Sequence, residues 1–220
     1  MTASEPPTAP RSPQRHYDRD SPEFGRVANL SDGVFAIAMT LLVLGLEVPA
    51  MGGAPLAALL RERIPNLVAF VLGFVLVANM WWAHHKFVSQ LGCFEPGLIR
   101  LNLLFLGAVA LAPFPTGLVG TAPHERAAVV PFILLFIALH CVFLAMVARA
   151  HGQQAWRWPL SATMYRWVRF SWLAAIAGMA VALLVALWVP VGGLVVATLN
   201  GVVTDRVIAR RAPRGYTEWS

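Results

Sequence analysis

The chain has 220 residues, of which 58% are hydrophobic and only 13% are charged, and its formal net charge is +6. This composition is typical of a polytopic membrane protein, because the core of a soluble protein of this length would not need so much apolar surface. The charge does not indicate a nucleic-acid partner, because 16 of the 17 basic residues are arginines that gather between apolar runs.

Residues 1–22 hold five prolines among polar residues and no apolar segment that a signal peptide would need. We predict a disordered cytoplasmic tail, and the composition favours a simple solvated extension over a Pro-rich arm that binds a partner. Residues 23–208 are predicted to form the membrane domain. Residues 209–220 are predicted to form a second cytoplasmic tail.

Residues 26–48 form the first predicted helix, which carries no charge from position 33 to position 46. At about 1.5 Å per residue, this helix can cross a hydrocarbon core roughly 30 Å thick. Arg26, Asn29, Ser31 and Asp32 lie in its first turns. An ionised carboxylate costs roughly 2.5 to 3.5 kcal/mol at the centre of a membrane, so Asp32 needs a partner. Arg26 is the nearest candidate in the sequence.

The first helix also carries an apolar stripe. At about 100° per residue, Asp32 points away from this stripe and Thr40 lies at its edge. The stripe consists of Arg26, Leu30, Gly33, Ile37, Leu41 and Leu44. Such a stripe could pack against another helix or line a narrow path by symmetry, and the pattern alone favours packing.

Five further apolar runs follow, and the third run of the chain is broken by Pro113 and Pro115. A basic and aromatic connection is expected over residues 149–169, where Trp and Arg side chains would meet the membrane interface. The runs cover residues 64–88, 96–118, 129–147, 170–189 and a short last segment from Pro190 to about Thr204. We therefore predict an all-α protein with six transmembrane helices and with both termini on one side.

Basic residues set the predicted orientation. Fourteen of them fall on the side of the termini and three (Arg61, Arg63 and Arg126) on the other. By the positive-inside rule, both termini are expected to be cytoplasmic. The predicted location is the plasma membrane or the cell inner membrane, as a multi-pass protein in contact with membrane lipids.

Three motifs occur in order over about residues 24–116. Arg26, followed by Leu30-Ser31-Asp32, resembles the Arg-x-x-x-Phe-Ser-Asp motif on the first helix of the transmembrane protein 175 family, potassium channels of lysosomes with bacterial relatives. Trp81-Trp82-Ala83-His84-His85 resembles the end of the family's second helix. Arg100-Leu101-Asn102-Leu103, followed by Pro113-Phe114-Pro115-Thr116, resembles its third helix. Leu30 departs from the motif, which usually has Phe, and this affects local packing.

The resemblance implies a potassium-permeable cation channel that conducts passively and needs no cofactor. A single repeat resembles the bacterial members, which implies a homotetramer whose pore is lined by four first helices. Ile37 would form the narrowest ring, with Leu41 and Leu44 toward the outside, and Thr40 would contribute to selectivity. Such a ring gates by dewetting. The chain has no Thr-Val-Gly-Tyr-Gly carbonyl filter.

The remaining motif residues are expected to brace the cytoplasmic end of the first helix. Arg26, Ser31 and Asp32 lie on that helix, and their candidate partners at the same membrane level are Trp81, His84, His85 and Asn102. A polar network in a membrane must be satisfied throughout. It would either be purely structural or couple helix packing to pore opening, and the sequence leaves both possibilities open.

Other readings of the same residues are weaker. Adjacent helical residues such as His84 and His85 project about 100° apart, unlike the i, i+4 pair that converges on zinc, so no metal site is predicted. An intramembrane enzyme would use the cluster of Asp32, His84 and His85, but no nucleophile accompanies it, so the chain is not expected to be an enzyme. A proton or weakly selective cation leak is the alternative transport function. His140 is either a hydrogen-bonded interior histidine or a proton relay.

Overall fold

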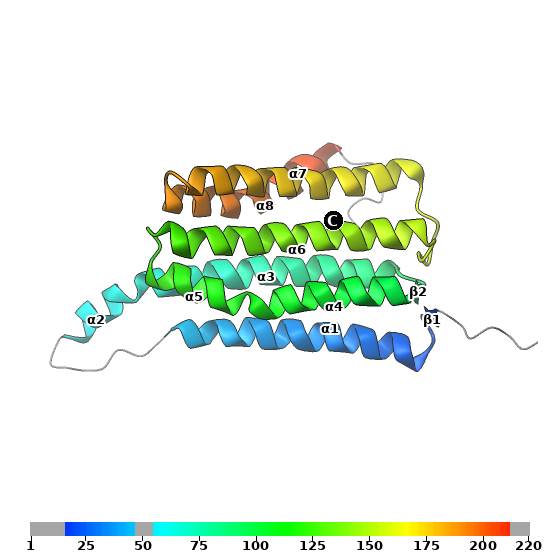
Figure 1. Ribbon diagram of the computed structural model, residues 1–220, viewed down its shortest axis with the longest axis horizontal. Coiled ribbons are helices and arrows are strands. Elements are labelled where there is room, and N and C mark those ends of the chain that lie inside the picture. The colour runs from blue at the N-terminus through cyan, green and yellow to red at the C-terminus, as the bar shows by residue number, and fades with distance from the viewer. Residues whose placement is uncertain (1–15, 47–54, 212–220) are drawn as a thin grey trace, which may run out of the picture.

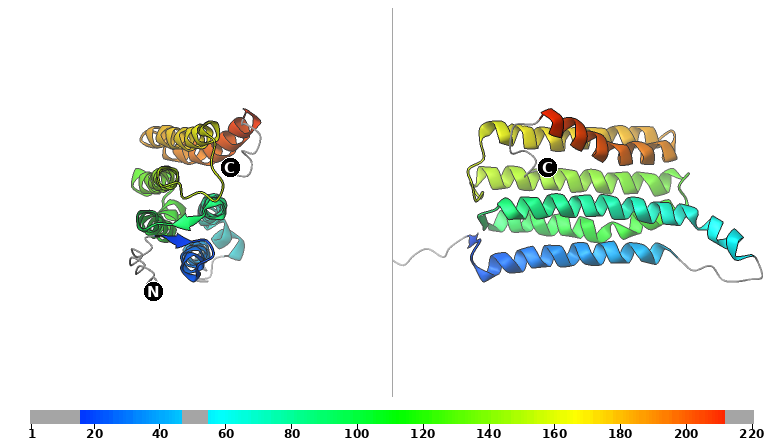
Figure 2. Two further views of the ribbon diagram at one scale, coloured as in Figure 1. Left: turned by 90° about the vertical axis from the view of Figure 1, so that its right-hand side faces the viewer. Right: turned by 180° about the vertical axis from the view of Figure 1, so that it is seen from behind.

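The computed structural model describes residues 16–46 and 55–211, which form a bundle of α-helices aligned along one axis (Figure 1). We predicted an all-α protein, and the described residues are mostly helical. The helices are α1 (Pro22–Leu41), α2 (Leu56–Glu62), α3 (Ile64–Gln90), α4 (Pro96–Leu111), α5 (Pro113–Thr121), α6 (Arg126–Gly152), α7 (Ala162–Ala186) and α8 (Pro190–Arg211), and a 3-10 turn, η1 (Leu42–Gly45), extends α1. The views of Figure 2 place α1 at one edge of the bundle and α7 with α8 at the opposite edge.

Local sequence signals explain where these helices begin. Ser21 is the N-cap of α1, and its hydroxyl accepts a hydrogen bond from the N–H of Phe24. Ser161 caps α7 in the same way by accepting from the N–H of Met164. Both side chains satisfy backbone donors that have no partner inside the helix. Proline at the first position of α1 and α4 fits the same positions, because the N–H that it lacks would be unpaired there.

Five helical segments of the described chain are long and apolar enough to cross a membrane. They are Pro22–Gly45, Ile64–Gln90, Pro96–Thr121, Arg126–Gly152 and Ala162–Ala186. The third segment is interrupted between α4 and α5, because Pro113 cannot donate a backbone hydrogen bond to the preceding turn. The predicted sixth span corresponds to α8, whose apolar part, Pro190–Gly201, is shorter than the other five.

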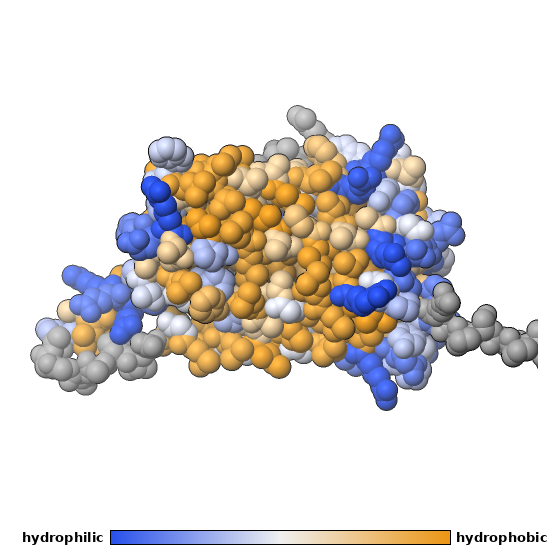
Figure 3. Space-filling view, in the orientation of Figure 1, coloured by the Kyte–Doolittle hydropathy of each residue, from blue (hydrophilic) through white to orange (hydrophobic). Residues whose placement is uncertain are grey.

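Apolar side chains cover the middle of the bundle and hydrophilic side chains gather at its two ends (Figure 3). The connection predicted over residues 149–169 is shorter than expected, because α6 continues to Gly152 and α7 already begins at Ala162. Arginine and tryptophan are tolerated on the helix ends because their long, amphipathic side chains reach the polar interface from inside the helical segment.

One end of the bundle carries most of the basic side chains and is called the arginine-rich end. The start of α1, the end of α3, the start of α4 and the two ends that join α6 to α7 lie there (Figure 1). Strand β1 (Tyr17–Asp18) pairs antiparallel with β2 (Cys93–Phe94) at this end. Six residues of the predicted tail, 16–21, are thus tied to the α3–α4 connection. Residues 1–15 and 212–220 lie outside the described residues.

The core between the helices is built mainly from aromatic and aliphatic side chains. α1 packs on α3 and α4, and α7 packs on α6 and α8. The fully buried phenylalanines are Phe35, Phe94, Phe105, Phe132 and Phe136. α7 and α8 approach closely because Gly193 has no side chain, and a Cβ there would overlap Ala186. Small residues are the usual means of close helix packing in a membrane.

Candidate functional site on the first helix

Helix α1 has one buried face and one exposed face. Phe24, Ser31, Phe35 and Ala38 are buried on the side of α3 and α4. The predicted stripe is exposed along its whole length, and so is Thr40 at its edge; the stripe consists of Arg26, Leu30, Gly33, Ile37, Leu41 and Leu44. Ile37 is 60% exposed and Leu44 is 70% exposed, so a single chain leaves this face without a packing partner among the described residues.

The stripe continues past the end of α1 because the helix tightens. Leu42–Gly45 form the 3-10 turn η1, in which residues three apart lie above one another. Leu41 and Leu44 therefore stay on the same side of the chain. The hydroxyl of Thr40 donates to the carbonyl oxygen of Ile37 at 2.8 Å, so the Thr40 oxygen keeps its lone pairs for accepting contacts.

On the buried face, three side chains form a continuous chain of hydrogen bonds across three helices. His84 Nε2 of α3 lies 2.8 Å from Asn102 Oδ1 of α4, and Asn102 Nδ2 donates to Ser31 Oγ of α1 at 3.0 Å. Ser31 in turn donates to the carbonyl oxygen of Val27 at 3.0 Å. Because an amide oxygen can only accept, this arrangement assigns the proton to Nε2 of His84. We call Ser31, Asn102 and His84 the hydroxyl–amide–imidazole network.

Aromatic rings enclose this network. His84 is 1% exposed, and its ring stacks on Phe105 with 5.5 Å between centroids and 6° between planes. Phe35 lies on another side of the imidazole, at 5.7 Å. In such surroundings an unpaired polar group is costly, so the hydrogen bonds fix the rotation of α1 relative to α3 and α4.

Asp32 is bound by Trp81 rather than by Arg26. Trp81 Nε1 donates to Asp32 Oδ1 at 2.9 Å, so one of the predicted candidates does lie beside the carboxylate. Arg26 and Asp32 are both exposed, and no ion pair joins these two described residues. Asp32 therefore lies at the border between the buried and the exposed face of α1.

The two adjacent histidines are separated. His84 is buried in the network, whereas His85 is exposed and stacks on Trp82, with 6.0 Å between centroids and 16° between planes. Within residues 16–46 and 55–211, no group of three or more His, Cys, Asp or Glu side chains could hold a metal ion. His140 lies apart on α6, where its Nδ1 is 2.6 Å from the carbonyl oxygen of Phe136 and its ring contacts Trp172. This is the geometry of a hydrogen-bonded interior histidine.

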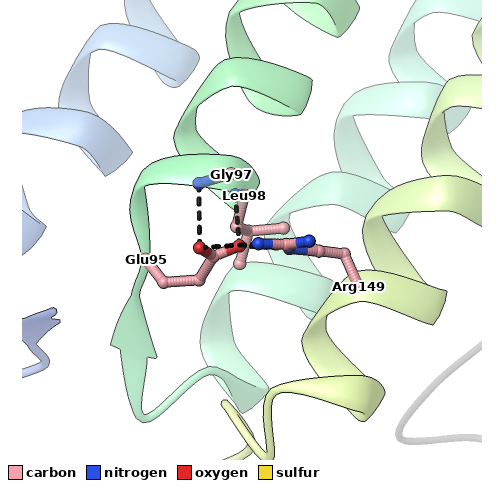
Figure 4. Close-up of polar contacts among 4 residues, drawn as sticks. All are labelled: Glu95, Gly97, Leu98 and Arg149. Atoms are coloured by element: carbon pink, nitrogen blue, oxygen red, sulfur yellow. Dashed lines mark hydrogen bonds and ion pairs between the residues drawn. The ribbon is translucent and has the colours of Figure 1, made fainter. Parts of the chain in front are cut away.

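An ion pair at the arginine-rich end was missed by the sequence analysis. Arg149 Nε donates to Glu95 Oε1 at 2.6 Å and Arg149 Nη2 to Oε2 at 3.2 Å, while the same carboxylate accepts from the N–H groups of Gly97 and Leu98 at the start of α4 (Figure 4). We call Glu95 and Arg149 the carboxylate clamp. The available signal was a glutamate directly before Pro96 and Gly97 at the start of an apolar run.

The surroundings of Glu95 keep its carboxyl group ionised. The hydrogen bonds from Arg149, together with those from Gly97 and Leu98, lower the pKa of Glu95 to about 2, against the opposing effect of burial. Gly97 is needed for this geometry, because a Cβ there would lie 2.7 Å from Arg149 Nη2. The clamp therefore joins the start of α4 to the last turns of α6.

Arg19 was also missed, because it lies in the segment assigned to the tail. Its Nη1 donates to the carbonyl oxygens of Val88, Ser89 and Leu91, at 3.3, 3.0 and 2.9 Å. A cation is favourable at the last carbonyls of a helix, where the helix dipole is negative. Arg19 thus caps α3 and holds the segment before α1 against the α3–α4 connection.

The fold and this site define a polytopic α-helical membrane protein whose first helix is fixed on one face and bare on the other. Residues 26–113 match the family described as endosomal/lysosomal potassium channel TMEM175. The chain is 39% identical to a potassium channel of Streptomyces collinus over 142 residues, which are 64% of this chain and 66% of that relative. It is 35% identical to a potassium channel of Chamaesiphon minutus over 127 residues, which are 55% and 63% of the two chains.

A solved structure agrees with these relatives. The crystal structure of a lysosomal potassium-selective channel TMEM175 homolog from Chamaesiphon minutus has a TM-score of 0.75 and 26% identity, and the match covers 84% of this chain and 98% of that one. The chain belongs to the TMEM175 family. It spans slightly less than two thirds of the length of the two potassium channels named above. Because this is a family of ion channels, the prediction that the chain is not an enzyme is confirmed.

Proposed function

We propose that the protein is a potassium-permeable cation channel that conducts passively through a central pore. The observation that carries this proposal is the exposed stripe of α1, since Ile37, Leu41 and Leu44 are 60%, 41% and 70% exposed in a single chain. The relatives from Streptomyces collinus and Chamaesiphon minutus are named as potassium channels, which supports the same function.

The proposed assembly is a homotetramer, and the same stripe supports it. Four copies of the chain arranged around an axis would bring four α1 stripes together, whereas the opposite face of α1 is already occupied by α3 and α4. The proposed membrane unit is residues 23–208, with α8 as the sixth span and tails at 1–22 and 209–220. The excess of arginine at one end supports cytoplasmic termini in a plasma membrane or cell inner membrane.

Ion preference would come from a dry constriction. A ring of Ile37 side chains forces an ion to shed part of its water shell, which costs less for potassium than for the smaller sodium. The lone pairs of Thr40, left free by its bond to the helix backbone, would offer oxygen contacts next to that ring. The hydroxyl–amide–imidazole network, together with Asp32 and Trp81, would hold α1 at the rotation that presents Ile37 to the pore.

Flux from liposomes tests the proposal. Vesicles containing the purified protein are given potassium, sodium or proton gradients, and the potassium flux is expected to exceed the sodium flux. Ile37→Asn should wet the constriction and raise the sodium flux while the tetramer remains. Leu184→Asn on α7 is the matched control, because Leu184 is 62% exposed, close to the 60% of Ile37, but lies outside α1.

Three outcomes would contradict parts of the proposal. An unchanged sodium flux in a tetrameric Ile37→Asn protein would remove Ile37 from the constriction. An equal effect of Leu184→Asn would show a general effect of a polar residue in the membrane. A proton flux well above the potassium flux would replace potassium conduction with the proton leak.

A further inference from the structure

A crevice of about 380 Å³ lies between α4 and α6 at the arginine-rich end, apart from the stripe of α1. It is lined by Gly97, Arg100, Leu101, Leu104 and Arg149. Four of these residues follow the spacing i, i+3, i+4 and i+7 along α4, so they form one wall of the crevice. Arg149 reaches the same space from α6.

The wall on α4 changes from cationic to apolar along its length. Arg100 is exposed near the start of the helix, and no carboxylate pairs with it among the described residues. Leu101 is half-buried, and Leu104, one turn further into the apolar segment, is 59% exposed. The crevice therefore has a positive mouth at the polar end of the bundle and an apolar floor that runs toward its middle.

The carboxylate clamp fixes the second cation. Arg149 uses Nε and Nη2 to bind Glu95, so the Nη1 edge of the guanidinium is left for a further acceptor. Gly97 keeps the space beside this guanidinium open, since a Cβ there would lie 2.9 Å from Arg149 Cζ. The charge of Arg149 is balanced by that of Glu95. Arg100 therefore gives the crevice one net positive charge.

We propose that this crevice binds an anionic phospholipid, with the headgroup phosphate between Arg100 and Arg149 and an acyl chain along Leu101 and Leu104. Charge complementarity selects an anionic headgroup, and guanidinium groups match phosphate oxygens in geometry. Basic pockets between helices at a membrane surface suit such headgroups. The apolar wall that continues into the membrane selects a lipid over a free anion. None of the residues that line this crevice lies on α1.

Native mass spectrometry of the intact protein in detergent tests the proposal, with dioleoylphosphatidylglycerol compared with dioleoylphosphatidylcholine. The phosphatidylglycerol is expected to bind more tightly. Arg100→Gln should weaken its binding about fivefold, because one basic side chain near a membrane surface is worth roughly 1 kcal/mol. Arg157→Gln is the matched control, because Arg157 is an exposed arginine at the same end of the bundle but outside the crevice.

Arg100→Lys is the second variant, and it should keep most of the preference because it keeps the charge. Equal binding of the two lipids, or an equal loss in Arg100→Gln and Arg157→Gln, would overturn the proposal. Displacement of the lipid by millimolar inorganic phosphate would replace the lipid site with a free-anion site. Because no flux is measured, these outcomes leave the channel proposal unaffected.

Discussion

Two polar clusters join helices in this protein, one through neutral groups and the other through full charges. The hydroxyl–amide–imidazole network joins Ser31, Asn102 and His84 through neutral groups, all of them buried between α1, α3 and α4. The carboxylate clamp joins Glu95 to Arg149 through full charges, and the Arg149 side chain is 43% exposed at the end of the bundle. The neutral network lies between apolar spans, whereas the charged pair lies where water reaches it.

The difference follows from the cost of removing charge from water. An ion pair between spans would have to recover a desolvation cost of several kcal/mol per ion, whereas a neutral chain of hydrogen bonds has much less to recover. At the end of the bundle, Arg149 keeps part of its hydration and the clamp is tolerated. We therefore expect the network to be sensitive to the loss of any partner and the clamp to be sensitive to pH.

The largest effect is expected for Asn102→Leu. The substitution leaves His84 Nε2 without its acceptor and Ser31 without a donor, so the free energy of unfolding should fall by about 3 kcal/mol. Asn29→Leu is the control, because Asn29 is exposed on α1. Unfolding in detergent is the measurement. If the two variants were equally stable, the buried network would contribute no more than a surface amide.

Glu95→Gln should have the next largest effect. It removes the charge that binds Arg149, and because Arg149 is partly exposed, a loss of about 1 to 2 kcal/mol is expected. Glu125→Gln is a close control, since Glu125 is also the N-cap residue of a helix but its side chain caps nothing. A double-mutant cycle with Arg149→Gln measures the coupling. A coupling of zero would show that the clamp is only a contact between surface groups.

The clamp should also make stability depend on acid. Because the pKa of Glu95 in the folded chain is about 2, below the value near 4.3 of a free glutamate, its carboxylate stabilises the folded state above about pH 4.5. This stabilisation, about 1 to 2 kcal/mol after allowance for solvent, is lost as the pH falls from about 4.5 to 2. The difference in the free energy of unfolding between the natural chain and Glu95→Gln should therefore be smaller at pH 3 than at pH 7. An equal difference at the two pH values would refute the role of the carboxylate.

The smallest effect on the stability of the single chain is expected for Asp32→Ala. Asp32 is an exception to the comparison above, because its carboxylate lies within a span. Trp81 loses its acceptor, but Asp32 is exposed, so a loss of about 0.5 to 1 kcal/mol is expected. Asp32→Asn should restore most of it, since an amide oxygen still accepts from the indole. Thermal stability and assembly should change more than ion preference. A larger change in ion preference would place Asp32 in the ion path.

Local features of α1 could be predicted because they depend on one helix alone. Hydropathy predicted six spans, and five of them lie at nearly the same residues as the helical segments that are long and apolar enough to cross a membrane. The period of 3.6 placed Ile37 and Leu44 on one face, where both are exposed, and Asp32 away from it. The partner of Asp32 was predicted only as one of several candidates, among which Trp81 was included. The nearest cation in sequence, Arg26, was the first candidate, and the observed partner is Trp81, 49 residues away.

The sequence by itself determined the class of protein, the apolar spans and the two faces of the first helix, because hydropathy and helical period are properties of consecutive residues. Only the tertiary structure decided which polar groups meet. Asn102 reaches Ser31, Arg149 reaches Glu95 and Arg19 reaches the end of α3 across 54 to 72 positions of the chain. These contacts depend on the depth and rotation of one helix relative to another, and those are set by packing across the whole bundle.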